Sequence, residues 1–219
     1  MNEAWPEIRA WRKAERERLI AARVAAARER REWSASIETT LETRLPFLAD
    51  ALVGFYWPFK GEFDARPLVR RLHGRGTRFA LPVVVEKAAP LVFRAWAPGD
   101  RLEPGIWQIP VPVEDRQVEP DLLLVPLVGF DTRGFRLGYG GGYYDRTIAK
   151  FGRRPLAIGI GFELSAIATI HPQPHDIPMD MIVTEAGLRQ VTADGLVAAA
   201  QTPSQAEIRR HRAKTGTPS

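Results

Sequence analysis

The chain has 219 residues, of which 45% are hydrophobic and 26% charged, and its formal net charge is +5. This length suits one sizeable hydrophobic core, and the composition is ordinary for a globular protein. The absence of cysteine excludes a disulfide framework, thiolate metal sites and a cysteine nucleophile. No apolar run reaches the length of a membrane span or of a signal peptide, so the sequence predicts a cytoplasmic protein with no membrane partner.

The N-terminal segment is rich in strong helix formers and predicts one long helix over residues 6–31, with Pro6 in its first turn. Its basic residues are typical of a solvated face. An incomplete apolar face is predicted from Ile8, Trp11, Leu19, Ile20 and Val24.

Beyond this helix, apolar runs alternate with helical patterns, which predicts an α/β fold with a largely parallel sheet. Further helices are predicted from Ser34 or Ser36 to about Asp50, over residues 65–73 behind a capping Asp64, from about residue 143 to 151, and over residues 162–170. Strands are predicted over residues 51–57, 78–85, 91–96, 121–128, 155–161 and 181–184, the last of them closing the sheet. Residues 1–199 are predicted to form one domain, and the composition of residues 200–219 indicates a disordered tail.

The most informative stretch is Gly129 to Arg146, which reads GFDTRGFRLGYGGGYYDR between a predicted strand and a predicted helix. Glycines let backbone N–H groups approach a ligand, and the first turn of a helix favours an anion, so this stretch predicts a phosphate cradle. Arg136 could clamp a phosphate and Asp145 could hold a divalent cation. The stretch lacks the lysine of a Walker loop and the third glycine of a dinucleotide loop. Gly138, Gly140, Gly141 and Gly142 could also form only a tight turn.

Three other positions could carry function, although each also has a structural explanation. Glu62 follows the first strand by five residues and would face the crevice at the carboxyl ends of the strands, unless it is a solvated loop residue. Trp107 could be a packing residue or a flat wall for an aromatic ligand. Asp176 follows His175 and could simply shape a turn. Zinc is not expected, because the chain has four histidines and no cysteine.

The glycine-rich stretch closely resembles the signature of the 5-formyltetrahydrofolate cyclo-ligase family, also called methenyltetrahydrofolate synthetases. The resemblance rests on Phe130-Asp131, Gly134, Arg136-Leu137-Gly138, Gly140 and Gly142-Tyr143-Tyr144-Asp145, and on the run Trp107 to Pro112. It implies a Rossmann-like sheet flanked by helices. It also implies ATP-dependent cyclisation of 5-formyltetrahydrofolate, as the monoglutamate or polyglutamylated, to 5,10-methenyltetrahydrofolate with release of ADP and phosphate.

The resemblance also implies roles for single residues. ATP would be bound by basic residues of the first helix and by the glycine-rich stretch: Arg12, Lys13, Arg16, Arg136, Leu137, Gly138, Gly140, Gly141, Gly142, Tyr143, Tyr144 and Asp145. Glu62, Trp107 and Tyr144 would contact the folate, with Glu62 and Arg136 catalytic, and Asp145 and Asp176 would hold Mg²⁺. One departure is Ser165, where many relatives have glutamine.

Two other functions are consistent with parts of the sequence. The basic helix and tail allow a non-catalytic nucleic-acid-binding or regulatory relative, although no nucleic-acid-binding motif is evident. A phosphatase acting on another phosphorylated vitamin is the second. The expected protein is a monomer that binds no nucleic acid.

Overall fold

The computed structural model describes residues 5–199, and the tail predicted for residues 200–219 lies outside this range. The helices are α1 Trp5–Ala25, α2 Glu29–Arg44, α3 Arg66–His73 and α4 Tyr143–Lys150, with short 3-10 helices η1 Pro46–Leu48, η2 Ile106–Gln108 and η3 Glu163–Ser165. The main sheet contains β1 Leu52–Gly54, β2 Arg78–Val83, β3 Val92–Trp96, β6 Gln117–Val118, β7 Leu122–Pro126, β10 Leu156–Ile160, β12 Met181–Thr184, β13 Gly187–Thr192 and β14 Gly195–Ala198. Two smaller sheets contain β8 Gly129–Asp131, β9 Arg136–Leu137 and β11 Ala166–Ile167, and β4 Leu102–Pro104 with β5 Pro110–Pro112.

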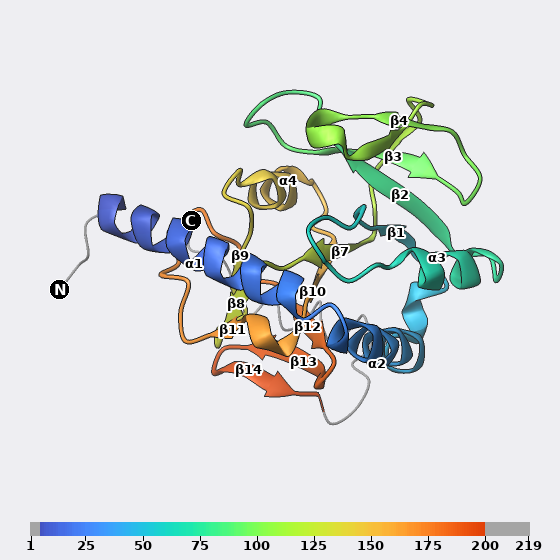
Figure 1. The fold of residues 1–219 in the computed structure, drawn as a ribbon. Coiled ribbons are helices and arrows are strands. Elements are labelled where there is room, and N and C mark those ends of the chain that lie inside the picture. Colours follow the sequence, from blue (N-terminus) through green and yellow to red (C-terminus); the bar gives the residue numbers. More distant parts are fainter. Residues whose placement is uncertain (1–4, 200–219) are drawn as a thin grey trace.

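The nine-stranded main sheet has the order β14-β13-β12-β10-β7-β1-β2-β3-β6 (Figure 1). Its strands β12, β10, β7, β1 and β2 run parallel, and the strands toward both edges are antiparallel. The predicted α/β class with a largely parallel sheet is therefore confirmed. No helix within residues 5–199 is long and apolar enough to cross a membrane.

The position of β7 inside the sheet explains why its sequence is apolar without interruption. Successive side chains of a strand point to opposite faces, and both faces of this sheet are covered. Leu122 and Leu124 belong to the core on one face, and Leu123 and Val125 to the core on the other.

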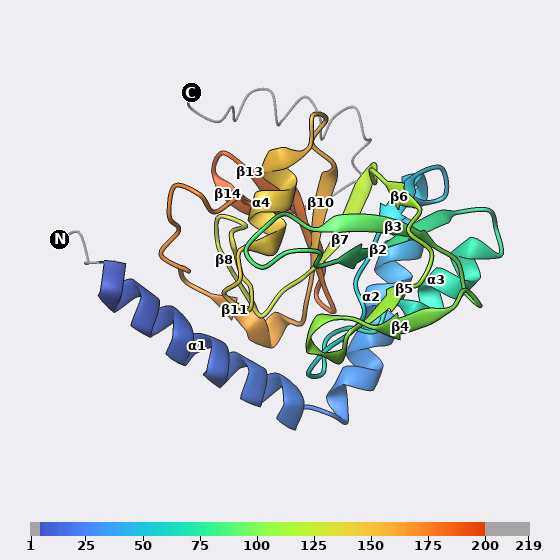
Figure 2. The same cartoon turned by 90° about the horizontal axis from the view of Figure 1, so that it is seen from above.

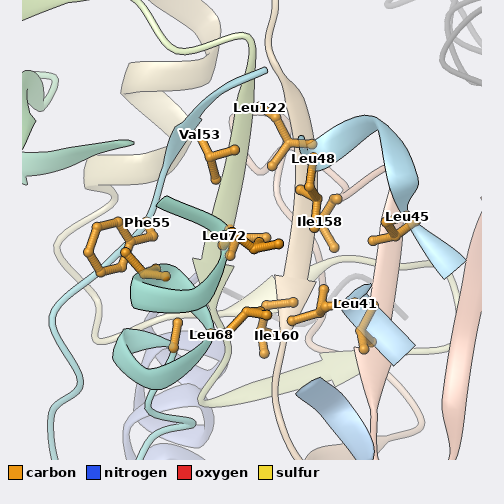
Figure 3. Packing of buried hydrophobic residues seen from close by; sticks show 14 of the residues in the cluster. Leu41, Leu45, Leu48, Val53, Phe55, Leu68, Leu72, Leu122, Ile158 and Ile160 are labelled. Carbon is orange, nitrogen blue, oxygen red and sulfur yellow. The ribbon is translucent and has the colours of Figure 1, made fainter. Parts of the chain in front are cut away.

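Helices α2 and α3 cover the first face of the sheet. Their buried leucines pack with β-strand side chains in one cluster, which Figure 3 shows around Leu41, Leu68, Leu72, Leu122 and Ile158. Burying each such side chain stabilises the fold by about 1.5–3 kcal/mol. Helix α4 covers the opposite face, where Ile148 packs in the cluster of Leu123 and Val125.

Helix α1 packs elsewhere, against the small sheet of β11, β8 and β9, as Figure 2 shows along the outside of the molecule. Its Leu19 is buried with Val128 and Leu137. The predicted apolar face of this helix is partly wrong, because Trp11 and Val24 are exposed. The buried residues of α1 are instead Ile8, Arg12, Leu19 and Arg23. Two of the four are arginines, so this face of the helix is built for polar contacts.

The predicted helix boundaries in the N-terminal region were wrong. Residues 6–31 do not form one helix, because a turn at residues 26–28 separates α1 from α2. Nothing in the local sequence breaks a helix there. The chain changes direction because α1 packs on the small sheet while Ile37 and Leu41 of α2 enter the core of the main sheet.

Three predictions in the second half of the chain also need correction. The first part of the Gly129–Arg146 stretch forms the hairpin of β8 and β9, so the glycines at residues 138–142 do not follow the buried strand directly. Residues 162–170 form η3 and β11 rather than a short helix, since β11 pairs with β8. The strand over residues 181–184 is not the last, because β13 and β14 continue the sheet as antiparallel strands.

Candidate active site

A cavity of about 600 Å³ opens at the carboxyl ends of the parallel strands. It lies where the segments that follow β1, β2 and β7 meet α1, the loop before α4 and the segment around residue 176. Among its lining residues are Arg9, Arg12, Arg16, Tyr56, Trp57, Lys60, Glu62, Trp107, Arg136, Leu137, the run 138–145, His175 and Asp176. All the predicted site residues except Lys13 therefore meet in one cavity.

The glycine turn, defined here as residues 138–142, leads from β9 into α4. Gly140 has φ +94° and Gly142 has φ +61°, both in the left-handed region that glycine adopts without strain. At Gly138 a Cβ atom would come within 2.5 Å of Nη1 of Arg136. The turn therefore needs glycine for its backbone conformation and for the close approach of an arginine. It presents the unpaired N–H groups of the first turn of α4 to the cavity.

Arg136 is held at this turn by its own carboxylate partner. Its Nη2 lies 2.6 Å from Oδ2 of Asp145, and its guanidinium lies over the ring of Tyr144 at 5.3 Å. Oδ1 of Asp145 accepts a hydrogen bond from the backbone N–H of Ile177. Nε of Arg136 and the hydroxyl of Tyr144 are buried and have no hydrogen-bond partner in the described residues. Unpaired polar atoms of this kind are costly, and these two belong to residues that line the cavity.

Helix α1 contributes two more arginines on its buried face. Arg12 pairs with Asp176 at 2.5 Å, so α1 is tied to the loop that precedes β12. Nε of Arg16 donates to the carbonyl oxygen of Gly138 at 2.7 Å. Burial lowers the pKa of Arg16, and the charge of neighbouring Arg12 lowers it further. Arg12, Arg16 and Arg136 around the glycine turn are called the arginine cluster below.

Lys13 does not share this position. It is exposed and lines a neighbouring hollow with Arg9, Arg16 and Gly140, so it lies beside the glycine turn but outside the main cavity. The spacing of a helix explains the difference, because residues 12 and 16 lie on one face and residue 13 is turned about 100° away. Which of these basic residues contacts a phosphate stays a prediction.

Glu62 is buried among aromatic and basic side chains. Its Oε1 accepts a hydrogen bond from the Tyr139 hydroxyl at 2.9 Å, and its Oε2 accepts one from the backbone N–H of Phe59 at 2.8 Å. Burial raises the pKa of Glu62 to about 7, against the opposing influence of the Arg23 charge and of both hydrogen bonds. A carboxyl group with this pKa can gain or lose a proton near neutral pH.

Arg23 and Tyr139 were not predicted as site residues. Nη2 of Arg23 donates to the Tyr139 hydroxyl at 2.8 Å, and Arg23 is only 2% exposed. Helical periodicity offered a signal for Arg23, because Arg12, Arg16, Leu19 and Arg23 follow at spacings of four, three and four residues. Tyr139 lay between two predicted glycines and had no signal of its own. Glu62, Tyr139, Arg23 and Tyr56 are called the Glu62 cluster below.

Trp107 stands at the rim of the cavity and is 59% exposed. Its backbone has φ +58° and that of Gln108 has φ +60°, conformations that are strained for residues other than glycine. The indole ring meets the ring of Tyr143 edge-on, with 5.8 Å between the ring centroids. The large exposed surface does not fit the packing role that was the alternative for this residue.

The two aspartates predicted to bind a metal line the same cavity, and each is paired with an arginine. Within residues 5–199 no three His, Asp or Glu side chains gather as a ready metal site. Mg²⁺ nevertheless needs few protein carboxylates when phosphates and water complete its oxygen shell. Asp145 and Asp176 therefore fit such an ion by their chemistry, provided that a nucleotide supplies the other oxygens.

Ser165, where the sequence departs from many relatives, is fully buried and does not line the cavity. Its hydroxyl has no hydrogen-bond partner among the described residues. The departure therefore concerns the packing beneath α1 rather than the wall of the cavity.

A glycine turn, three arginines and a buried carboxyl group at the carboxyl ends of parallel strands define an α/β enzyme for a phosphorylated ligand. The chain belongs to the 5-formyltetrahydrofolate cyclo-ligase family, whose family model matches residues 8–185. It is 31% identical to the 5-formyltetrahydrofolate cyclo-ligase of Escherichia coli K12, in an alignment that covers 74% of this chain and 93% of the relative.

Two solved structures share the fold. The 5,10-methenyltetrahydrofolate synthetase of Aquifex aeolicus is 30% identical, with a TM-score of 0.72 over 82% of this chain and 92% of the other. The synthetase of Mycoplasma pneumoniae has a TM-score of 0.65 over 80% of this chain and 98% of the other, and at 24% identity it supports the fold alone. The predicted family and its Rossmann-like α/β fold are confirmed.

Proposed function

We propose that this protein catalyses the ATP-dependent cyclisation of 5-formyltetrahydrofolate to 5,10-methenyltetrahydrofolate, with release of ADP and phosphate. Membership in this ligase family implies the use of ATP. The observation that carries the proposal is the single cavity in which the arginine cluster and the glycine turn adjoin the Glu62 cluster. One cavity can therefore hold a polyphosphate beside a second substrate.

The chemical problem is a poor leaving group. A formamide oxygen leaves only after activation, and transfer of the γ-phosphoryl group to that oxygen produces a phosphorylated imidate. The neighbouring folate amine then attacks the imidate carbon, loses its proton, and phosphate departs with the electron pair of the C–O bond. The protein must align the phosphoryl group and neutralise its charge, and then accept the amine proton.

The arginine cluster supports the first task. Arg136 and Arg16 lie at the glycine turn, where N–H groups and guanidinium groups together suit the oxygens of a transferring phosphoryl group. Leu137 is buried in β9 and sets the start of the turn, and Gly141 and Tyr143 complete it. Arg12 acts through Asp176, which it holds by an ion pair.

The Glu62 cluster supports the second task. With a pKa of about 7, Glu62 is ionised in a large fraction of molecules at neutral pH and can take up the proton of the attacking amine. Trp107 and the unpaired hydroxyl of Tyr144 provide a flat ring and a polar contact for the folate.

We further propose that Asp145 and Asp176 bind Mg²⁺ together with the nucleotide. Bound there, the ion would supply positive charge that neutralises the phosphate groups. The pairing of each aspartate with an arginine supports a site that assembles only with nucleotide, because the arginines balance the carboxylates until the ion arrives.

A non-catalytic nucleic-acid-binding relative has no support. A protein that had lost catalysis would have no need to keep its catalytic residues. Here one cavity is lined by all four of the predicted ones: Glu62, Arg136, Asp145 and Asp176. A monomer in the cytoplasm stays a prediction from the sequence, for which light scattering and cell fractionation are the measurements.

The test is the absorbance of methenyltetrahydrofolate after mixing the protein with Mg-ATP and 5-formyltetrahydrofolate. We expect product only when all components are present, so each is omitted in turn. Nucleotide hydrolysis that needs no formyl-folate would indicate a phosphatase instead. Salt-sensitive RNA binding without turnover would indicate the non-catalytic relative.

A further inference from the structure

We propose that Tyr139, supported by Arg23, is a positioning residue that orients the Glu62 carboxyl group and holds it in the ionised form. The catalytic consequence of this proposal rests on the proposed function. The contact itself does not, because it is built from side chains of the protein alone.

The direction of the hydrogen bonds follows from the donor and acceptor inventory. A guanidinium group has only donors, so the Tyr139 oxygen accepts from Nη2 of Arg23 at 2.8 Å. The single hydroxyl proton is then free for one acceptor. Oε1 of Glu62 lies at 2.9 Å and the carbonyl oxygen of Phe59 at 3.4 Å, so the proton goes to the carboxylate. Charge-assisted donation of this kind favours the ionised carboxylate.

Arg23 is fixed in place by two further hydrogen bonds. Its Nε donates to the carbonyl oxygen of Lys60 at 3.1 Å, and its Nη1 to that of Leu127 at 2.9 Å. It forms no ion pair with a carboxylate of the described residues. Its charge acts on Glu62 through space and lowers the pKa of Glu62, while its Nη2 is bonded to the Tyr139 hydroxyl rather than to the carboxylate.

Every titratable group that faces Glu62 affects the equilibrium between its ionised and neutral forms. Tyr56 comes from the segment after β1 and Tyr144 from α4, and the pKa of each is raised, mainly by burial. Both are therefore neutral near pH 7. Lys60 lies on the same loop as Glu62 and lines the cavity. The Arg23 charge, the backbone N–H of Phe59 and the Tyr139 hydroxyl are consequently the groups that favour the carboxylate against the effect of burial.

Tyr139 also links the two halves of the cavity. It belongs to the glycine turn, between Gly138 and Gly140, while Glu62 belongs to the loop after β1. The same turn that offers N–H groups to a phosphate thus supplies the donor that orients the carboxyl group. The glycine turn would thus contact the nucleotide directly and position Glu62 for the folate.

The test begins with the protein free of substrates. The Glu62 carboxyl group is titrated by ¹³C NMR in protein labelled at the glutamate side-chain carboxyl carbon, with Glu62→Gln to assign the signal. Tyr139→Phe removes only the hydroxyl from a ring that is 43% exposed, so the fold should be retained. We expect the pKa of Glu62 to rise by about one unit. Tyr143→Phe, in the same stretch but without contact to Glu62, should leave this titration in place.

The second measurement is the pH dependence of kcat/KM for cyclisation. In Tyr139→Phe the acidic limb should move upward by the same amount, so that kcat/KM falls about tenfold at pH 6 and little at pH 9. A purely structural role would lower the rate equally at all pH values.

The outcomes separate the two proposals. An unchanged Glu62 titration in Tyr139→Phe overturns the positioning role, whatever the activity. If the Glu62 titration shifts in Tyr139→Phe but the pH profile of kcat/KM does not, the contact exists and has no catalytic consequence. A shifted titration in a protein whose wild type forms no methenyltetrahydrofolate supports the contact and refutes the proposed function instead.

Discussion

The arginine cluster and the Glu62 cluster meet in one cavity but are encoded in different ways. Arg136, the glycine turn and Asp145 lie within ten consecutive residues, and only Arg12 and Arg16 come from far away. The Glu62 cluster comes from three separate segments: Arg23 from α1, Tyr56 and Glu62 from the segment after β1, and Tyr139 from the glycine turn. The first cluster therefore depends on a local backbone conformation, whereas the second depends on how α1, β1 and the glycine turn pack together.

The two clusters also differ in electrostatics. The arginine cluster balances cations with Asp145 and Asp176 in close ion pairs. The Glu62 cluster holds a cation and a carboxyl group apart, with the hydroxyl of Tyr139 between them. Burial leaves Glu62, which has no ion pair within the described residues, with a pKa of about 7. The first arrangement suits charge neutralisation, and the second suits proton transfer.

The largest expected effect comes from Arg136→Ala. We expect a loss of ~10²-fold or more in kcat/KM for ATP, as for removal of an electrostatic clamp, with little change in folate binding. Steady-state kinetics with each substrate varied in turn measure this. Arg153→Ala serves as the control, because Arg153 is exposed and does not line the cavity. Near-normal kinetics for Arg136→Ala would remove Arg136 from the site.

Glu62→Gln should change the pH dependence of stability. The folded pKa of Glu62 is about 7 and its ordinary pKa is 4.5, so the favourable contribution of Glu62 is present below pH 4.5 and is lost as the pH rises to about 7. Relative to Glu62→Gln, wild type should therefore lose on the order of 3 kcal/mol of unfolding free energy between pH 4.5 and 8.

Urea unfolding of both proteins at several pH values measures this difference. The exposed residue Glu114 provides a matched control, since Glu114→Gln should show no such trend. A difference between wild type and Glu62→Gln that is constant from pH 4.5 to 8 would mean that Glu62 titrates normally.

Asp145→Asn and Asp176→Asn should each raise the magnesium concentration for half-maximal rate, by roughly tenfold. The double variant should not simply add the two effects, because both residues act on one ion. Asp194→Asn, in the exposed turn between β13 and β14, is the control. If Asp176 only anchors Arg12, its replacement will lower the melting temperature while the magnesium titration stays at the wild-type value.

Trp107→Ala should have the smallest effect. We expect the KM for 5-formyltetrahydrofolate to rise about fivefold, and Trp107→Phe to restore most of it, because a flat ring is retained. Since Trp107 also contacts Tyr143 near the glycine turn, the KM for ATP is the informative comparison. A larger rise for ATP than for folate would assign Trp107 to the nucleotide.

The sequence by itself determined the α/β class, the glycine turn with Arg136 and Asp145, and the family, because these depend on local patterns. Apolar runs of strand length predicted β7, β10 and β12. The clustered glycines predicted the turn near residue 140, where Gly140 and Gly142 adopt the left-handed conformation. The same patterns could not reveal the break at residues 26–28 or the strand β11, since uniform helical propensity and a short segment leave several conformations open.

Only the tertiary structure decided which face of α1 is buried. Packing on the small sheet turned Arg12 and Arg16 toward the cavity, buried Arg23 against Tyr139, and left Lys13 and Val24 exposed. It also brought Tyr139 to Glu62 across 77 residues of sequence. A proton-transfer site depends on burial and on distances between side chains, and these are properties of the packed molecule rather than of any segment of its sequence.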